Sequence, residues 1–189
     1  HLIPMRDNFW LEMHVGNNGD ASEPCPDKTH PSNSAEEREE FYNLGEIGYM
    51  LAKKVQAQAY IAEHPAFVAR LTVKRIFYIW TGYWSTDPKF LADEPLHIPG
   101  VFYSTLVTLM SLTGIWLAYR NGVGELMIPL ALAMFSFPLV YYITHPSYDY
   151  RHPLDPIMAM MMAYAYAELR NAIPGREPQF EQILESGGD

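Results

Sequence analysis

The residues best suited to chemistry lie in a polar stretch before the last apolar run of the chain. Arg151 stands there between Tyr150 and His152. Its planar guanidinium can bind a phosphate or pyrophosphate through two parallel N–H donors, and the tyrosine ring can lie beside a lipid or sugar. The structural alternative is an arginine that snorkels from a membrane helix end amid interfacial aromatic side chains. The spacing alone leaves both interpretations open.

A second polar group lies near the start of the chain. It contains Glu12, then Gly16 followed by Asn17 and Asn18, with aromatic residues interleaved. Polar side chains mixed with aromatic rings at a turn suit a carbohydrate or a lipid head group. The alternative is a packed loop held by hydrogen bonds from the asparagine side chains.

Other chemical motifs are missing from the sequence. The seven histidines form no HExxH pattern, and the single Cys25 excludes a CxxC pair. There is no phosphate-binding glycine loop and no Gly-x-Ser-x-Gly turn. We therefore predict no metal site and no cofactor. A net charge of −9 without a basic stripe argues against nucleic acid as a partner.

Two long apolar runs must position any such site. Val101–Tyr119 and Leu126–Thr144 are 19 residues each and contain no charged residue. A helix needs about 20 residues to cross a hydrocarbon core, and backbone groups in lipid must be satisfied within the segment. The two runs therefore predict a helical membrane hairpin, with a kink at Pro138. The shorter run Pro156–Ala167 is interpreted as a third membrane helix.

The polar half of the chain predicts two further helices. Ser34-Ala35-Glu36-Glu37 is a capping box that starts a helix ending near Glu63. We expect one apolar stripe along this helix, formed by Phe41, Leu44, Leu51, Val55 and Ala62. Pro65–Trp84 follows as an amphipathic helix lying in the membrane interface, with Arg70, Lys74 and Arg75 directed toward lipid phosphates. The alternative is an ordinary amphipathic helix packed on the preceding one.

The predicted fold class is all-α, with about three membrane helices preceded by an extramembrane helical segment. The expected segments are a loop-rich part (1–34), amphipathic helices with a Pro-rich connector (35–100), the transmembrane hairpin (101–145), a polar loop with the third membrane helix (146–169) and a polar tail (170–189). The arginines of the short turn and the tail favour a cytoplasmic position, which places residues 1–100 outside.

The order of several motifs resembles a known family. Asn8-Phe9-Trp10-Leu11-Glu12 leads into Gly16-Asn17-Asn18; then come Leu44-Gly45-Glu46, Glu63-His64-Pro65, an aromatic-basic helix and Tyr150-Arg151-His152-Pro153. This order is similar to that in bacterial polytopic glycosyltransferases of the dolichyl-phosphate-mannose–protein mannosyltransferase and aminoarabinose transferase group, which share the GT-C fold.

The resemblance implies transfer of a sugar from a polyprenyl-phosphate donor to an envelope lipid, protein or glycan, in a bacterial inner membrane. It implies a donor-phosphate role for Arg151, with Tyr150 and His152 beside it, and a match of Glu12, Asn17 and Asn18 to a family segment of unassigned role. We interpret the chain as the C-terminal part of a larger protein. We therefore expect the catalytic carboxylate upstream of His1 and further membrane helices as partners.

A hypothesis from another functional class also stays open, namely that the protein is a non-catalytic membrane scaffold or a transporter subunit. Transporters place charged residues or broken helices at mid-membrane. The uncharged runs argue mildly against transport and leave the scaffold possible.

Overall fold

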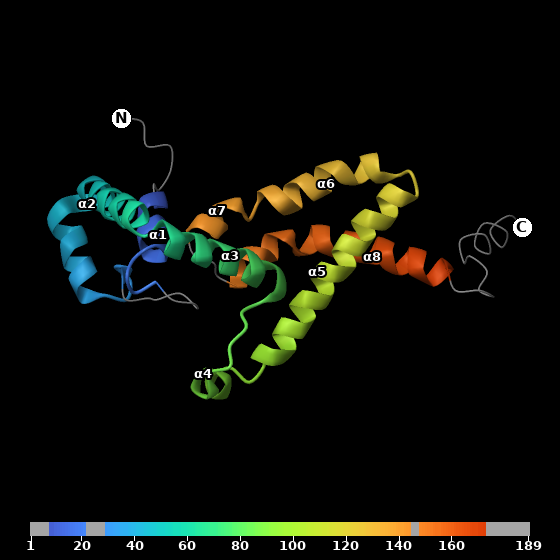
Figure 1. Cartoon of the computed structure of the whole chain (residues 1–189), viewed down its shortest axis with the longest axis horizontal. Coiled ribbons are helices and arrows are strands. Elements are labelled where there is room, and N and C mark those ends of the chain that lie inside the picture. The colour runs from blue at the N-terminus through green and yellow to red at the C-terminus, as the bar shows by residue number, and fades with distance from the viewer. Residues whose placement is uncertain (1–7, 22–28, 145–147, 173–189) are drawn as a thin grey trace, which may run out of the picture.

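The computed structural model describes residues 8–21, 29–144 and 148–172, and within these ranges it contains helices and no strand. The α-helices are α1 (Phe9–Gly16), α2 (Ala35–Glu63), α3 (Pro65–Thr81), α4 (Pro88–Asp93), α5 (His97–Arg120), α6 (Gly124–Ser136), α7 (Leu139–Ile143) and α8 (Asp155–Asn171), and the 3-10 helix η2 is Tyr148–Leu154. Figure 1 shows α1 and α2 at one end of an elongated molecule and α5, α6 and α8 toward the other. The all-helical class is confirmed.

Helix α2 starts as the capping box predicts but does not run straight. The Ser34 Oγ accepts a hydrogen bond from the Glu37 N–H at 3.2 Å. At Gly45 the backbone leaves the helical region, with φ 66° and ψ 166°, a conformation that favours glycine. The break folds the first part of the helix back toward the second, and Tyr49 of the second part packs with Phe41 of the first.

The predicted apolar stripe of α2 is therefore wrong. Leu51 and Val55 are 57% and 67% exposed, and Leu44 is also exposed. The buried residues of α2 are Tyr49, Met50, Lys53 and Ala57. The break changes which side faces inward, and Tyr49 and Met50 form a core with Leu11 and Val15 of α1.

Helix α3 lies at the centre of the molecule, where it packs against α5 and α7. Pro65 opens it, since the first helical position needs no N–H donor. It ends at Gly82, whose φ is 84°. A Cβ at Gly82 would lie 3.3 Å from the Val101 Cα atom, so this glycine permits close approach of α3 to the start of α5.

The predicted hairpin is present as two helices apolar and long enough to be candidate membrane spans. These are α5, and α6 together with α7, over Gly124–Ile143. The expected kink at Pro138 is seen as a break between α6 and α7, because proline lacks the N–H that would continue the helix. At 1.5 Å per residue, the two spans are about 36 Å and 30 Å long.

Helix α8 runs beside α5 in the same direction. Met158, Met161 and Ala165 are its buried residues. Opposite them on α5 lie Ser111 and Gly114: the Ser111 hydroxyl is 3.1 Å from the Met158 carbonyl oxygen. A Cβ at Gly114 would lie 2.1 Å from the Met161 carbonyl oxygen. The two backbones are therefore in direct contact. Helix α8 has 17 residues and is not one of the two candidate spans.

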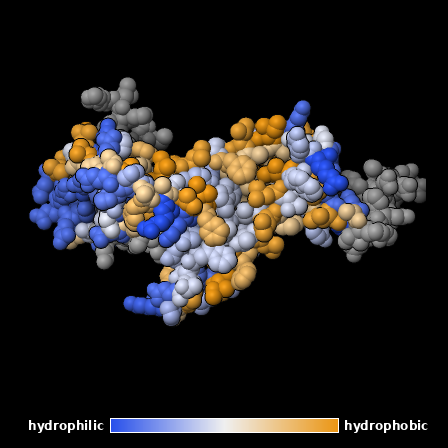
Figure 2. Space-filling model, in the orientation of Figure 1, coloured by the Kyte–Doolittle hydropathy of each residue, from blue (hydrophilic) through white to orange (hydrophobic). Residues whose placement is uncertain are grey.

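Hydrophobic surface is unevenly distributed. Figure 2 shows hydrophobic residues over α6 and the adjoining part of α5, and hydrophilic residues over α2 at the opposite end. Only 11% of the most apolar window of the second span is buried within the protein. A surface of this kind is typical of helices in lipid, so the two apolar helices are consistent with a membrane association of this part of the chain.

The Pro-rich connector over 85–100 contains more structure than predicted. Asp87 caps α4 by accepting from the Lys89 N–H at 3.0 Å, and α5 already begins at His97. The polar loop after the hairpin contains η2, and α8 continues to Asn171. The rest of the predicted tail, and residues 1–7, 22–28 and 145–147, lie outside the described residues.

Candidate functional site

Arg151 lies where three helices meet. Its Nη1 donates to the carbonyl oxygen of Trp80, at the end of α3, at 3.2 Å and to that of Ser104, in α5, at 3.1 Å. The Trp80 carbonyl also accepts from the Thr108 hydroxyl at 2.5 Å. A cation at a helix C-terminus is favourable, so Arg151 fastens η2 to the end of α3.

The environment of Arg151 is partly dehydrated. Burial lowers the pKa of its guanidinium from the ordinary value, and the carboxylate of Asp155 opposes that shift. Arginine nevertheless stays charged at neutral pH. The side chain is therefore a positive charge held at the junction of α3, α5 and η2.

Tyr150 and His152, the neighbours of Arg151, point to different surroundings. The ring of Tyr150 stacks on that of Tyr141 in α7, with centroids 4.3 Å apart. The Nδ1 of His152 lies 2.9 Å from the Asp155 carboxylate in a solvent-exposed pair. Tyr150 thus ties η2 to the second span, whereas His152 lies at the surface.

Asn17 belongs to a second buried group of hydrogen bonds. Its Nδ2 donates to the carbonyl oxygens of Met13 at 2.9 Å and Ile143 at 2.8 Å. Its Oδ1 accepts from Arg75 at 3.3 Å. Arg75 also donates to the Gly16 and Ile143 carbonyl oxygens. We call Asn17, Arg75 and the carbonyls of Gly16 and Ile143 the Arg75 junction.

The position of Arg75 corrects the prediction that it faces lipid phosphates. It is 1% exposed, whereas Arg70 and Lys74 on the same helix are exposed. The guanidinium lies at the C-terminal ends of α1 and α7, where carbonyl groups without helical partners need donors. Both arginines, Arg75 and Arg151, therefore hold helix ends together.

Asn18 and Glu12 have local positions. The Asn18 Nδ2 donates to the His14 carbonyl at 2.8 Å and its Oδ1 accepts from the Asp20 N–H at 2.8 Å. Glu12 lies in the first turn of α1, where an acidic side chain is favourable. These contacts agree with the loop held by asparagine hydrogen bonds, and a ligand role for these residues stays a prediction.

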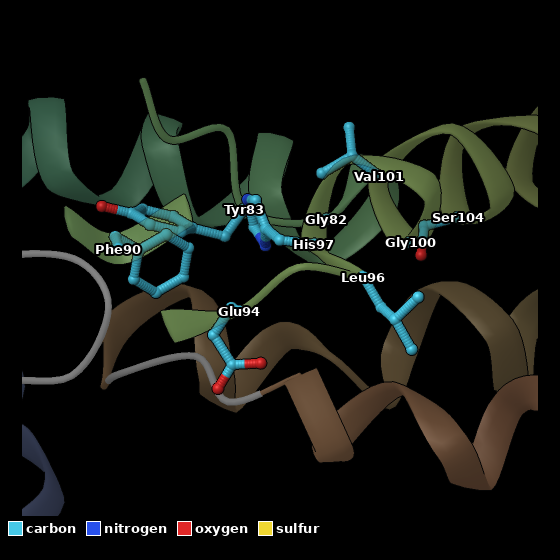
Figure 3. Close-up of a pocket in the computed structure, with 9 residues that line it drawn as sticks. All are labelled: Gly82, Tyr83, Phe90, Glu94, Leu96, His97, Gly100, Val101 and Ser104. Carbon is cyan, nitrogen blue, oxygen red and sulfur yellow. The ribbon is translucent and has the colours of Figure 1, made fainter. Parts of the chain in front are cut away.

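A pocket of about 320 Å³ opens where α3, α4 and α5 meet. Its chemical groups are the rings of Tyr83 and Phe90, the Glu94 carboxylate, the His97 imidazole and the polar backbone around Gly100 and Ser104. Figure 3 shows the Tyr83, Phe90 and His97 rings gathered on one side, with Glu94 and Leu96 on the other. Ser104 connects this pocket to Arg151, because its carbonyl accepts from that guanidinium.

The aromatic rings of the pocket form an edge-to-face cluster. The His97 ring centroid lies 4.8 Å from that of Phe90 and 5.8 Å from that of Tyr83. The His97 Nε2 is buried and has no hydrogen-bond partner within the described part of the protein. A buried polar atom without a partner is unusual and calls for a water or a ligand.

Sequence reasoning missed this pocket and the Arg75 junction. Glu94 and His97 fall in the predicted Pro-rich connector, and nothing in their spacing indicates that α4 and α5 bring them together. The sequence prediction groups Arg75 with two exposed basic residues, although it lies four residues after the buried Leu71 and four before the buried Ile79. That helical spacing was the available signal.

Comparisons of the chain with protein-family models, with curated proteins and with solved structures find no match.

Proposed function

We propose that this chain is part of a membrane-embedded glycosyltransferase that moves a sugar from a polyprenyl-phosphate donor to an envelope lipid, protein or glycan. The observation that carries the proposal is the pocket with a carboxylate, an imidazole and aromatic rings at the N-terminal end of candidate span α5. Such a transfer joins a lipid-anchored donor to a polar acceptor, so its site belongs at the membrane boundary.

The lengths of the spans support a boundary position for the pocket. Helix α5 is about 36 Å long, whereas a hydrocarbon core is about 30 Å thick, so about one turn of α5 lies outside the core. His97 and Gly100 belong to the first turn of α5. Nearby Trp80, Tyr83 and Trp84 are residue types that gather at membrane interfaces.

Arg151 supplies the charge that a phosphate donor requires. Its Nη1 makes both of its backbone hydrogen bonds, which leaves the other side of the guanidinium fork for a phosphate oxygen. We therefore assign the donor phosphate to Arg151 and place the pocket beside it. The catalytic carboxylate of the resembling family is not assigned to any residue of this chain.

The proposal includes a third membrane helix, a topology and a cellular location. Backbone contact with α5 at Gly114 supports a lipid environment for α8, because such close approach is typical of helix pairs in membranes. The Asn121 Nδ2 donates to Glu168 at 2.9 Å, so Arg120 and Arg170 lie near the same end. The positive-inside rule favours a cytoplasmic position for that end and an extracytoplasmic one for the pocket end; a bacterial inner membrane is what the family resemblance implies.

Sugar transfer by the intact protein in membranes tests this proposal. A radiolabelled polyprenyl-phosphate sugar is the donor, and Arg151→Gln is compared with Arg151→Lys and with Arg70→Gln, a change at an exposed arginine of α3. We expect the glutamine variant to raise the donor KM at least about tenfold, the loss of one charged hydrogen bond, and the lysine variant to lose less.

The control at Arg70 should transfer sugar normally. Equal donor KM values in all three variants would remove Arg151 from the phosphate site. No transfer by well-folded wild-type protein, with any of several polyprenyl-phosphate sugars, would reject the enzyme and favour the non-catalytic scaffold.

A further inference from the structure

The pocket between α3, α4 and α5 has a chemical composition that limits what can bind in it. Glu94 supplies a carboxylate, and no lysine or arginine stands among the described residues that line the pocket. A ligand phosphate placed there would meet a negative charge without a lining cation, which is unfavourable. The pocket is therefore suited to a neutral group, whereas a phosphate would bind at Arg151.

The unpartnered imidazole nitrogen defines one ligand group. The His97 Nε2 is buried without a hydrogen-bond partner within the described part of the protein, and leaving such a group unsatisfied is unfavourable. The Glu94 carboxylate on the other side of the pocket accepts hydrogen bonds only. A hydroxyl group can donate to either of them, so two hydroxyl groups on one ligand would satisfy both.

The remaining lining defines the body of that ligand. The Tyr83 and Phe90 rings, 5.5 Å apart, and the side chains of Leu96 and Val101 are apolar surfaces. The C–H faces of a saturated ring can pack on them. The volume of about 320 Å³ lies at the small end of the range for ligand pockets, which fits a single ring.

We propose that this pocket binds a neutral saturated ring carrying several hydroxyl groups, with one hydroxyl at the His97 Nε2 and another at the Glu94 carboxylate. A sugar residue and a cyclitol head group share this chemistry. The role of the bound ring as a substrate of transfer rests on the function proposed above, whereas the binding itself can be measured without transfer.

Gly100 offers a way to close the pocket without disturbing the fold. It lines the pocket, and a Cβ built on it has no other atom within 4 Å. A leucine there therefore extends into open space, and it also favours the helical conformation of α5. Thr113→Leu, on α5 but away from the pocket, adds a similar side chain as a matched control.

Saturation-transfer NMR on the intact protein in nanodiscs tests the proposal. The probes are methyl glucoside, methyl mannoside, myo-inositol and glucose 6-phosphate. We expect at least one neutral ring to bind more tightly than the phosphate, and a sugar preference over inositol, or the reverse, to identify the source of the ring. Gly100→Leu and His97→Phe should each weaken that binding at least about tenfold, equivalent to one lost hydrogen bond.

His97→Phe keeps an aromatic ring in the cluster and removes only the nitrogen atoms, while Thr113→Leu should bind as the wild type does. No binding of any neutral ring, tighter binding of glucose 6-phosphate, or unchanged binding by Gly100→Leu would each overturn the proposal. Ring binding without sugar transfer would reject the proposed enzyme and leave this site in place. If Gly100→Leu leaves sugar transfer unaffected, the proposed enzyme stands and this pocket is rejected as its ring-binding site.

Discussion

The α1–α2 pair and the α5–α8 pair are stabilised in different ways. In the first pair a charged side chain is buried: Lys53 is 1% exposed and its Nζ lies 2.6 Å from Glu37 and 3.0 Å from Glu40. In the second pair the helix backbones touch at Gly114. Ion pairs join the two parts of α2, whose apolar residues pack against α1, whereas small residues that permit close approach hold α5 and α8 together.

This difference indicates two surroundings. The two glutamates of this ion pair are partly exposed, with side chains 17% and 36% accessible, which favours a position outside lipid. Burial of Leu11, Val15, Tyr49 and Met50 supplies a hydrophobic core there. In lipid the hydrophobic effect does not drive helices together, so close packing of small residues and interhelical hydrogen bonds must stabilise a helix pair. Ser111 and Gly114 supply these on α5.

Gly114→Leu should have the largest effect, because it separates the α5–α8 pair. The new Cβ would lie 2.1 Å from a backbone oxygen of Met161, which cannot move away as a flexible side chain could. We expect a loss of about 3 kcal/mol or more, seen as loss of a monodisperse, protease-resistant protein in detergent. Leu109→Ala, on the exposed face of α5, is the control. If Gly114→Leu resists protease as well as the wild type does, backbone contact between α5 and α8 is contradicted.

Lys53→Met should destabilise the contact between the two parts of α2 by about 3 kcal/mol at pH 7, because Glu37 and Glu40 lose a buried cation. Burial raises the pKa of Glu37, but hydrogen bonds from Lys53 and Tyr49 outweigh it and lower the pKa overall. The wild type should therefore lose stability as the pH falls below about 4.5, the ordinary pKa.

In Lys53→Met the pKa shift of Glu37 should have the opposite sign, because burial then dominates and raises that pKa. Protonation of that carboxylate should stabilise the variant, so its deficit shrinks as the pH falls toward 4.5. Denaturant unfolding at several pH values measures this, with Lys74→Met at an exposed site as control. A difference in unfolding free energy between variant and wild type that does not change with pH would contradict the effect of Lys53 on the pKa of Glu37.

Arg75→Met tests the connection between the two regions. The change removes the donors from the Gly16 and Ile143 carbonyls and from Asn17. We expect a loss of about 2–3 kcal/mol and faster amide exchange at the ends of both α1 and α7. Arg70→Met makes the same substitution at an exposed position and serves as the control. If faster amide exchange in Arg75→Met is limited to α3, the Arg75 junction is contradicted.

His152→Ala should have the smallest effect. Its pair with Asp155 is exposed, with side chains 69% and 51% accessible, and such pairs contribute about 0.5 kcal/mol or less. The unfolding free energy should stay within that margin of the wild type. A larger loss would show that η2 depends on this pair rather than on Arg151 and Tyr150.

The sequence predicted helices where a local signal was strong. Helix starts at Ser34 and Pro65 and the break at Pro138 follow from the chemistry of those residues. The two uncharged runs predicted helices because each is long enough to cross a membrane. The inward face of α2 could not be predicted, because the single residue Gly45 changes the direction of the chain. The pocket depends on how α3, α4 and α5 pack, which neighbouring residues do not encode.

The Arg75 junction also constrains the order of events during synthesis of the chain. Arg75 donates to a carbonyl 68 residues further along, at the end of the second candidate span. That hydrogen bond can form only after the ribosome has made the second candidate span, whereas the partners Gly16 and Asn17 precede Arg75 in the chain. Completion of the Arg75 junction is therefore a late step, which follows synthesis of that span.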